Sequence, residues 1–179
     1  MSRIGSAYAQ GLYTLAAEEA LTGQILQQLQ VLDESFSENP DFIRLLSAPN
    51  LSKQERCQIL DDSFRGKIHG YVLNYLKLLT EKGYIRHFSD SVRAYTDQYN
   101  ADNGVLVVEA VSAVALSQQQ KTRLIQKLEA MTGKIVQLRQ RIDPQVLGGL
   151  RLDYDGKRID GTVKNRLEAV GKLLQNTVI

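Results

Sequence analysis

The stretch IDPQVLGGLRLDYDGKRIDGTVKNRLEAV, residues 142–170, combines a glycine pair, two Asp-Gly steps and a charged run with helical periodicity. A dinucleotide-binding loop needs G-x-G-x-x-G between a strand and a helix, and a P-loop ends in Gly-Lys-Ser/Thr. Gly148-Gly149 fits neither spacing, because the two glycines are adjacent and lead into a strand pattern. Adjacent glycines at the start of a strand are typical of a bulge or of a close approach between backbones. We therefore predict that they shape the backbone and bind no cofactor.

The sequence on either side of the glycines predicts a small α+β unit over residues 104–179. Asp155-Gly156 is a strong signal for a two-residue hairpin turn. Asp160 can belong to the turn or cap before the helix expected at Thr162, where its carboxylate can accept backbone N–H bonds. Period-2 and period-3.6 apolar patterns give the remaining elements. In order, we expect a strand at 105–111, a helix at 117–131, strands at 134–142, 149–154 and 157–159, and a last helix at 162–176.

The first part of the chain predicts helices only. Ser52 stands three residues before Glu55, which is the spacing of a capping box, and Pro40 can occupy the first turn of a short helix. Glycines 66 and 83 are placed to end helices. The expected helices are 4–20, 23–36, 40–46, 52–64, 67–82 and 85–99. Six short helices without an intervening strand favour an antiparallel bundle.

Composition and charge are those of an ordinary globular protein with two unequal parts. The 179 residues are 43% hydrophobic and 23% charged. Residues 1–103 carry ten basic and thirteen acidic residues and residues 104–179 carry twelve and seven, so their net charges are −3 and +5. This asymmetry indicates two units with different partners, although a normally solvated surface also produces it. We expect neither a membrane span nor a secretory signal, and the single cysteine suits a reducing compartment.

No catalytic or metal-binding constellation is evident in the sequence. Cys57 lies within a helical pattern and is expected to be a small buried residue. His69 and His87 lack a second ligand at helical spacing, so we expect structural roles and no metal site. The acidic pair Asp61-Asp62 is adjacent on a helix, points in different directions and is expected to be solvated. The sequence therefore indicates an interaction protein.

The quoted stretch also resembles the C-terminal signature of the delta-subunit family of F-type ATP synthases, which includes the mitochondrial oligomycin sensitivity-conferring protein. The resemblance extends over essentially the whole chain, in the family's order. Gly148, where many members have alanine, and Tyr84, where the family often has arginine, depart from the pattern. The matching residues are Ala7-Tyr8-Ala9, residues 74–79 with Gly83, Val111-Ser112-Ala113 before Leu116-Ser117, Ile142-Asp143, Val146, Gly148-Gly149, Leu150, Leu152, and residues 159–163 through Arg166-Leu167.

The resemblance implies a fold and a role. The fold class is α+β, with a six-helix antiparallel bundle at 1–103 followed by a small α/β domain with a short mixed sheet at 104–179. The role is that of a non-catalytic stator subunit, without cofactor or metal. The bundle binds the N-terminal helix of the alpha subunit, and the second domain binds the b subunit of the peripheral stalk. The protein then resists rotor torque during proton-driven ATP synthesis, and it associates indirectly with the cytoplasmic face of the bacterial cell membrane.

The resemblance also implies two sets of site residues. In the family, the first and fifth helices form the groove for the alpha helix, and here both have apolar residues on more than one face, so one face can meet a partner. A core role without a partner remains open for each groove residue. We expect the groove to be lined by Tyr8, Leu12, Leu15, Tyr71, Tyr75, Leu76 and Leu79. The structural signature of the stalk-side domain is Gly148, Gly149, Asp160, Gly161 and Arg166.

Two other classes of protein remain as alternatives. A nucleic-acid-binding module could use the basic residues of the second domain, namely Arg139, Arg141, Arg151, Lys157 and Arg158. Against it, Tyr154 is the only aromatic residue after position 103, so the domain lacks the stacking platform of an RNA-recognition sheet. A small enzyme is disfavoured because no nucleophile, base and orienting group occur together. We expect no nucleic-acid partner.

Overall fold

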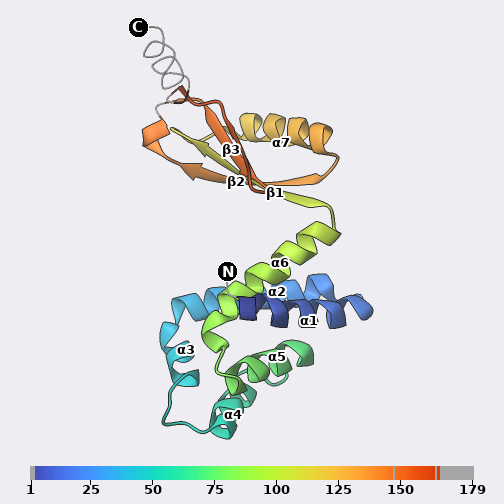
Figure 1. Cartoon of the computed structure of the whole chain (residues 1–179), viewed down its shortest axis with the longest axis vertical. Coiled ribbons are helices and arrows are strands. Elements are labelled where there is room, and N and C mark those ends of the chain that lie inside the picture. The colour runs from blue at the N-terminus through green and yellow to red at the C-terminus, as the bar shows by residue number, and fades with distance from the viewer. Residues whose placement is uncertain (1–2, 147, 164, 166–179) are drawn as a thin grey trace, which may run out of the picture. The chain divides into compact units, whose positions relative to one another are not determined.

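The computed structural model describes residues 3–146, 148–163 and 165, and the chain forms two compact units, residues 1–99 and 100–179 (Figure 1). The described part contains helices in the first unit and a four-stranded mixed sheet with one covering helix in the second. The elements are α1 (Arg3–Glu18), α2 (Thr22–Glu38), α3 (Pro40–Leu46), α4 (Lys53–Phe64), α5 (Gly70–Glu81), η1 (Ile85–His87), α6 (Phe88–Asp102), β1 (Val105–Ser112), α7 (Gln118–Thr132), β2 (Ile135–Ile142), η2 (Pro144–Val146), β3 (Leu150–Tyr154) and β4 (Lys157–Asp160). The α+β class and the mixed sheet are confirmed, and the antiparallel order of the bundle stays a prediction.

Two capping boxes fix the starts of α4 and α7. The Ser52 hydroxyl accepts the Glu55 N–H at 3.2 Å, while Glu55 Oε2 accepts the Ser52 N–H at 2.8 Å. Ser117 and Gln120 repeat this exchange before α7. Each box satisfies backbone donors that the first turn of a helix leaves without partners. The box predicted at Ser52 is confirmed.

The bounds of α5 and α6 differ from the expected ones. α5 begins at Gly70 and not at Lys67, because His69 is extended and its Nδ1 accepts the Tyr71 N–H at 3.3 Å as an N-cap. α6 continues to Asp102, past the expected end at Tyr99. Residues 100–102, which follow the expected end of this helix, are therefore helical.

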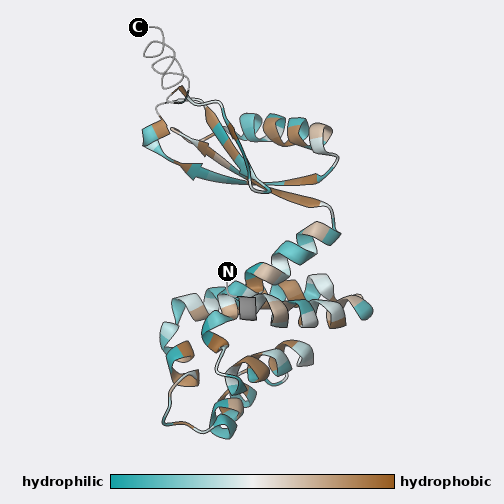
Figure 2. Ribbon diagram, in the orientation of Figure 1, coloured by the Kyte–Doolittle hydropathy of each residue, from teal (hydrophilic) through white to brown (hydrophobic). Residues whose placement is uncertain are grey.

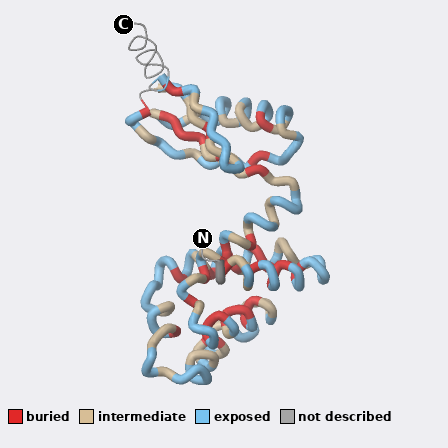
Figure 3. The backbone as a smooth tube through the Cα atoms, in the orientation of Figure 1, coloured by how far each residue is buried: buried red, intermediate tan, exposed pale blue. Residues whose placement is uncertain are grey.

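The helical unit has one hydrophobic core, made by the inward faces of its helices. Figures 2 and 3 show hydrophobic and buried positions following these faces, with hydrophilic, exposed positions on the opposite sides. Aromatic rings fill much of the space: Tyr13 and Tyr95 meet edge-on at 5.1 Å between centroids, and Phe36 contacts the rings of Phe42 and Phe88. The contact of Tyr13 with Tyr95 turns one face of α1 inward, and on α5 the buried residues Val72, Leu76 and Leu79 mark the inward face.

The second unit is a sheet with the strand order β2-β1-β3-β4. β1 and β2 are parallel from Val105↔Ile135 onward, whereas β3 pairs antiparallel with β1, and β4 with β3. α7 connects the parallel pair and packs Leu128 against the buried residues of one face, including Val108 and Leu152. Because side chains alternate along a strand, the intervening residues of β1 and β3 point to the other face.

The glycine pair brings two backbone segments together, as the sequence predicts. Gly149 has φ of 84°, and a Cβ built there would lie 2.6 Å from the carbonyl oxygen of Gly161. The Gly161 N–H donates to the Leu150 carbonyl at 3.0 Å, and the Val163 N–H donates to the Gly148 carbonyl at 3.0 Å. A side chain at Gly149 would separate the strands' ends, so the residue is set by close approach and not by a phosphate.

The remaining expectations concern the hairpin and the last helix. Asp155 and Gly156 both have positive φ, 45° and 70°, which confirms the two-residue turn between β3 and β4. The helix expected at 162–176 lies almost entirely outside the described residues, as does Arg166. In the described part of the chain, no helix combines the length and apolar character needed to cross a bilayer.

Candidate functional site: the groove between α1 and α5

A mostly apolar groove lies between α1 and α5, with a volume of about 430 Å³. Its floor includes Leu12 and Tyr75, which are buried in the core, while Leu15 and Leu78 beside them stay partly exposed. On α1 the lining residues follow steps of three and four residues, and the same holds on α5. The lining residues are Ala7, Tyr8, Gly11, Leu12 and Leu15 from α1 and Tyr71, Asn74, Tyr75 and Leu78 from α5.

Five of the seven expected groove residues line it, and two do not. Leu76 and Leu79 are fully buried, with 0% of their surface exposed, and belong to the core. Their expected place in the groove is wrong, because α5 turns them toward the other helices. Leu78, between them in the sequence at position i+3 from Tyr75, keeps 38% of its surface exposed and lines the groove instead.

Sequence reasoning missed four lining residues: Ala7, Gly11, Asn74 and Leu78. A signal existed for Gly11, which continues the helical stripe of Tyr8 and Leu15, and for Asn74, which lies on the stripe of Tyr71. Leu78 and Leu79 both stand at helical spacing from Tyr75, so the sequence does not choose between them. The small residues Ala7 and Gly11 leave room between the helices. Ala7, Gly11 and Asn74 are not large apolar residues, whereas Leu78 is as apolar as Leu79 beside it in the sequence.

Tyrosines mark the walls and one end of the groove. The Tyr71 hydroxyl donates to Glu19 Oε1 at 2.5 Å, joining the start of α5 to the end of α1, and this hydrogen bond raises the pKa of Tyr71. Tyr75 is almost fully buried, and burial raises its pKa to about 12, so it stays neutral at physiological pH. Tyr8 packs against Tyr84, with 5.9 Å between ring centroids. The groove thus offers apolar area with few polar groups, as a helix-binding surface does.

The described signature residues of the second unit, Gly148, Gly149, Asp160 and Gly161, form a turn. Asp160 Oδ1 accepts the Thr162 N–H at 3.0 Å, and hydrogen bonds from Thr162 hold the pKa of Asp160 below its ordinary value. The Thr162 hydroxyl in turn accepts the Asn165 N–H at 3.2 Å. Asp160 thus accepts a backbone N–H in the turn before Thr162, as expected, while the bond from Asn165 to Thr162 has the spacing of an N-cap. Gly148, Gly149 and Gly161 shape the adjoining backbone.

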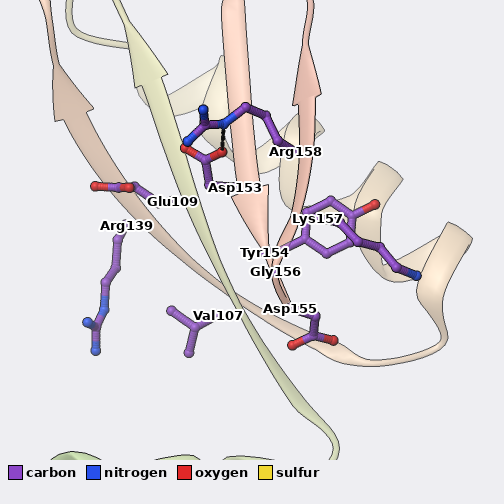
Figure 4. A pocket seen from close by; sticks show the side chains of 9 residues that line it. All are labelled: Val107, Glu109, Arg139, Asp153, Tyr154, Asp155, Gly156, Lys157 and Arg158. Carbon is purple, nitrogen blue, oxygen red and sulfur yellow. Dashed lines mark hydrogen bonds and ion pairs between the residues drawn. The ribbon is translucent and has the colours of Figure 1, made fainter. Parts of the chain in front are cut away.

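The face of the sheet opposite α7 carries a row of charges across a hollow of about 720 Å³ (Figure 4). Arg158 Nε lies 2.6 Å from Asp153 Oδ1, and this contact holds the pKa of Asp153 low. Arg151 Nε is 3.1 Å from the other oxygen of Asp153, and Arg141 Nε is 3.3 Å from Glu109 Oε1. Three of the arginines expected to serve a nucleic-acid surface are therefore paired with carboxylates, which reduces their attraction for phosphates.

Comparison with known proteins assigns the chain to a family. Residues 4–174 match the family model of the ATP synthase delta (OSCP) subunit. The chain belongs to this family. The relatives it matches include ATP synthase subunit delta of Gloeobacter violaceus, 32% identical over 173 residues with 92% of this chain and 90% of that protein covered. Another is ATP synthase subunit delta of Clostridioides difficile, 30% identical over 176 residues with 98% and 97% covered.

A chain of a solved structure has the same fold as this protein. A chain in the cryo-EM structure of the Toxoplasma gondii mitochondrial ATP synthase hexamer superposes with a TM-score of 0.77, covering 97% of this chain and 98% of that chain. At 16% identity, this likeness is one of fold alone. The likeness of fold extends over both units.

The cysteine and the acidic pair singled out in the sequence have the following surroundings in the structure. Cys57 was expected to be buried, but it is only half-buried. Its Sγ donates to Glu81 Oε1 at 3.6 Å. Burial, together with the nearby Glu81 carboxylate, raises the pKa of the thiol. A reactive thiol needs the opposite shift. Asp61 is also not solvated as expected: its side chain is 13% exposed and lies 2.6 Å from Lys77 Nζ. Among the described residues, no group of three or more potential ligands is placed to hold a metal ion.

Proposed function

We propose that the chain is the non-catalytic stator subunit of an F-type ATP synthase. In this role it links the N-terminal helices of the alpha subunits to the b subunit of the peripheral stalk and resists rotor torque during proton-driven ATP synthesis. Its association with the cytoplasmic face of the membrane would be indirect, through the complex. Membership of the delta family supports the proposal, and the groove between α1 and α5 is the observation that carries it.

The groove supports the proposal because it leaves apolar side chains accessible along two helices. Leu15 is 49% exposed and Leu78 is 38% exposed, although both lie within stripes of core-forming helices. An amphipathic helix laid between them would cover this surface through apolar contacts, the usual mode of helix-in-groove recognition. Such a site suits a partner that carries mechanical load. The binding free energy at the site comes from buried apolar area and not from surface ion pairs, which salt weakens.

We assign the two partners to the two units. Residues 1–103 contain the groove and would bind the alpha-subunit helix. Residues 104–179 carry the opposite net charge, have their own core behind α7 and present an open charged face, and they would bind the b subunit. Separate cores and separate surfaces allow one chain to hold two partners at once.

Titration of the full-length protein with a synthetic peptide of the alpha-subunit N-terminal helix tests the proposal. Calorimetry should show binding that Leu15→Asp removes. Val31→Asp is the matched control, because Val31 is an equally apolar and even more exposed residue, 62%, on α2 outside the groove. Absence of binding to the unchanged protein, or equal loss in both variants, would contradict the assignment.

A further inference from the structure

The groove has one polar side chain in the middle of its apolar lining. Asn74 lies on α5 between Tyr71 and Leu78, one helical turn from each. It is exposed, and it makes no hydrogen bond to the part of the chain that the structure describes. In the free protein, water therefore satisfies its carboxamide, which offers two N–H donors and one carbonyl acceptor.

Covering the groove changes the situation of Asn74. A bound helix displaces the water and leaves the carboxamide against a surface that is otherwise made of Tyr8, Leu12, Leu15 and similar residues. A buried amide without a partner is unfavourable by more than a typical hydrogen bond contributes. A helix that places an apolar side chain at this point is consequently rejected relative to one that places a hydrogen-bonding side chain there. A single buried asparagine fixes the register of helix pairs in coiled coils for the same reason.

One end of the groove carries a second polar feature. Glu18 and Glu19 follow each other at the end of α1, both exposed, and neither forms an ion pair within the described residues. The Tyr71 hydroxyl holds one oxygen of Glu19, which places this carboxylate beside the groove lining and leaves its other oxygen available. An accessible carboxylate pair at the rim attracts a basic side chain of whatever helix lies in the groove.

We propose that Asn74 and the Glu18–Glu19 pair set the register of the helix held in the groove, by requiring one hydrogen-bonding side chain opposite Asn74 and one basic side chain near the two glutamates. The inference rests on the proposed function and names what that function's partner helix must present. Tyr71 lies one turn before Asn74 on α5, and its hydroxyl donates a hydrogen bond to Glu19. The two features of the partner are therefore separated by about one to two helical turns, roughly four to seven residues.

The test is an alanine scan of the alpha-subunit N-terminal peptide against full-length proteins of four kinds: unchanged, Asn74→Leu, Glu19→Gln and Gln27→Leu. Gln27 is an exposed carboxamide on α2 and serves as the control for Asn74→Leu, and glutamine at position 19 can still accept the Tyr71 hydrogen bond. Thermal unfolding of each variant, compared with the unchanged protein, shows that the fold is kept. Asn74→Ala repeats the measurement should Asn74→Leu not fold.

With the unchanged protein and with Gln27→Leu, one uncharged polar position of the peptide should weaken binding about tenfold when replaced by alanine. With Asn74→Leu, replacement at that position should have almost no effect. One basic position of the peptide, one to two helical turns from the polar one, should contribute a salt-dependent part of the binding affinity. That contribution should be lost with Glu19→Gln and with no other variant. Tight binding with the same alanine profile in all four proteins would overturn this proposal and leave the proposed function standing. No binding of the unaltered peptide to the unchanged protein would overturn both.

Discussion

Leu78 and Leu79 are neighbours in the sequence, yet the structure gives replacements at the two positions opposite consequences. Leu79 is fully buried in the core of the helical unit, whereas Leu78 lines the groove with 38% of its surface exposed. An aspartate at Leu79 would bury an unpaired carboxylate and should unfold the unit. An aspartate at Leu78 can keep its charge in water, so the unit should keep its native circular dichroism and lose the alpha-subunit peptide.

The size of the effect on binding follows from the exposed fraction. Fully burying a leucine is worth about 1.5–3 kcal/mol, so covering the remaining 38% of Leu78 contributes about 1 kcal/mol, and Leu78→Ala should weaken binding about fivefold. Leu78→Asp adds the desolvation of a carboxylate and should exceed about 2 kcal/mol, roughly thirtyfold. Leu79→Ala instead leaves a cavity and should lower the free energy of unfolding by about 2–5 kcal/mol.

Calorimetric titration together with circular dichroism and thermal melts distinguishes the two residues. The reasoning fails if Leu78→Asp binds the peptide as well as the unchanged protein does. It also fails if Leu79→Asp keeps native helicity and a native melting temperature. The first result would show that Leu78 does not contact the peptide, and the second that Leu79 does not support the core.

Three further results are expected. Gly149→Val should destabilise the second unit by more than about 2 kcal/mol in thermal unfolding, whereas Gly133→Ala, at a positive φ but with nothing within 4 Å, should cost only about 1 kcal/mol; equal effects would count against close approach. Ser52→Ala should lower the stability of the helical unit by about 1 kcal/mol in denaturant unfolding, and an unchanged midpoint would exclude a stabilising cap. The pKa of Asp61 is held below its ordinary value of 3.8 by Lys77, so its contribution is present at neutral pH and is lost as pH falls through the lowered value. In Asp61→Asn, the free energy of unfolding should therefore fall less as the pH is lowered into the acid range. A pH profile identical to that of the unchanged protein would contradict this coupling.

Much of the fold could be predicted because its boundaries rest on local signals. Ser52 and Glu55 exchange hydrogen bonds within one turn, and Asp155-Gly156 needs only its own backbone angles to reverse the chain. Gly149 was expected at a close approach, and the approaching carbonyl belongs to Gly161, within the same quoted stretch. These features depend on residues that are near each other in the sequence.

The faces of α5 could not be predicted in the same way. Leu76, Leu78 and Leu79 are alike in hydrophobicity, and the helix is apolar around most of its circumference, so periodicity cannot tell the core side from the groove side. What decides is which helices lie against it. The burial of Cys57 and Asp61 could not be predicted for the same reason. Both lie on α4, and their partners Glu81 and Lys77 lie on α5, which is distant in the sequence.

A photocrosslink within the assembled enzyme tests the central claim most directly. Benzoylphenylalanine placed at Leu78, the exposed α5 residue of the groove, should capture the N-terminal segment of the alpha subunit in membranes that contain the whole ATP synthase. The same probe at Val31 on α2 should not, because that residue lies outside the groove. Capture from Leu78 and not from Val31 is the result expected. Capture of the alpha subunit from Val31 alone, or from neither position in an intact complex, would show that the groove is not where the catalytic head is held.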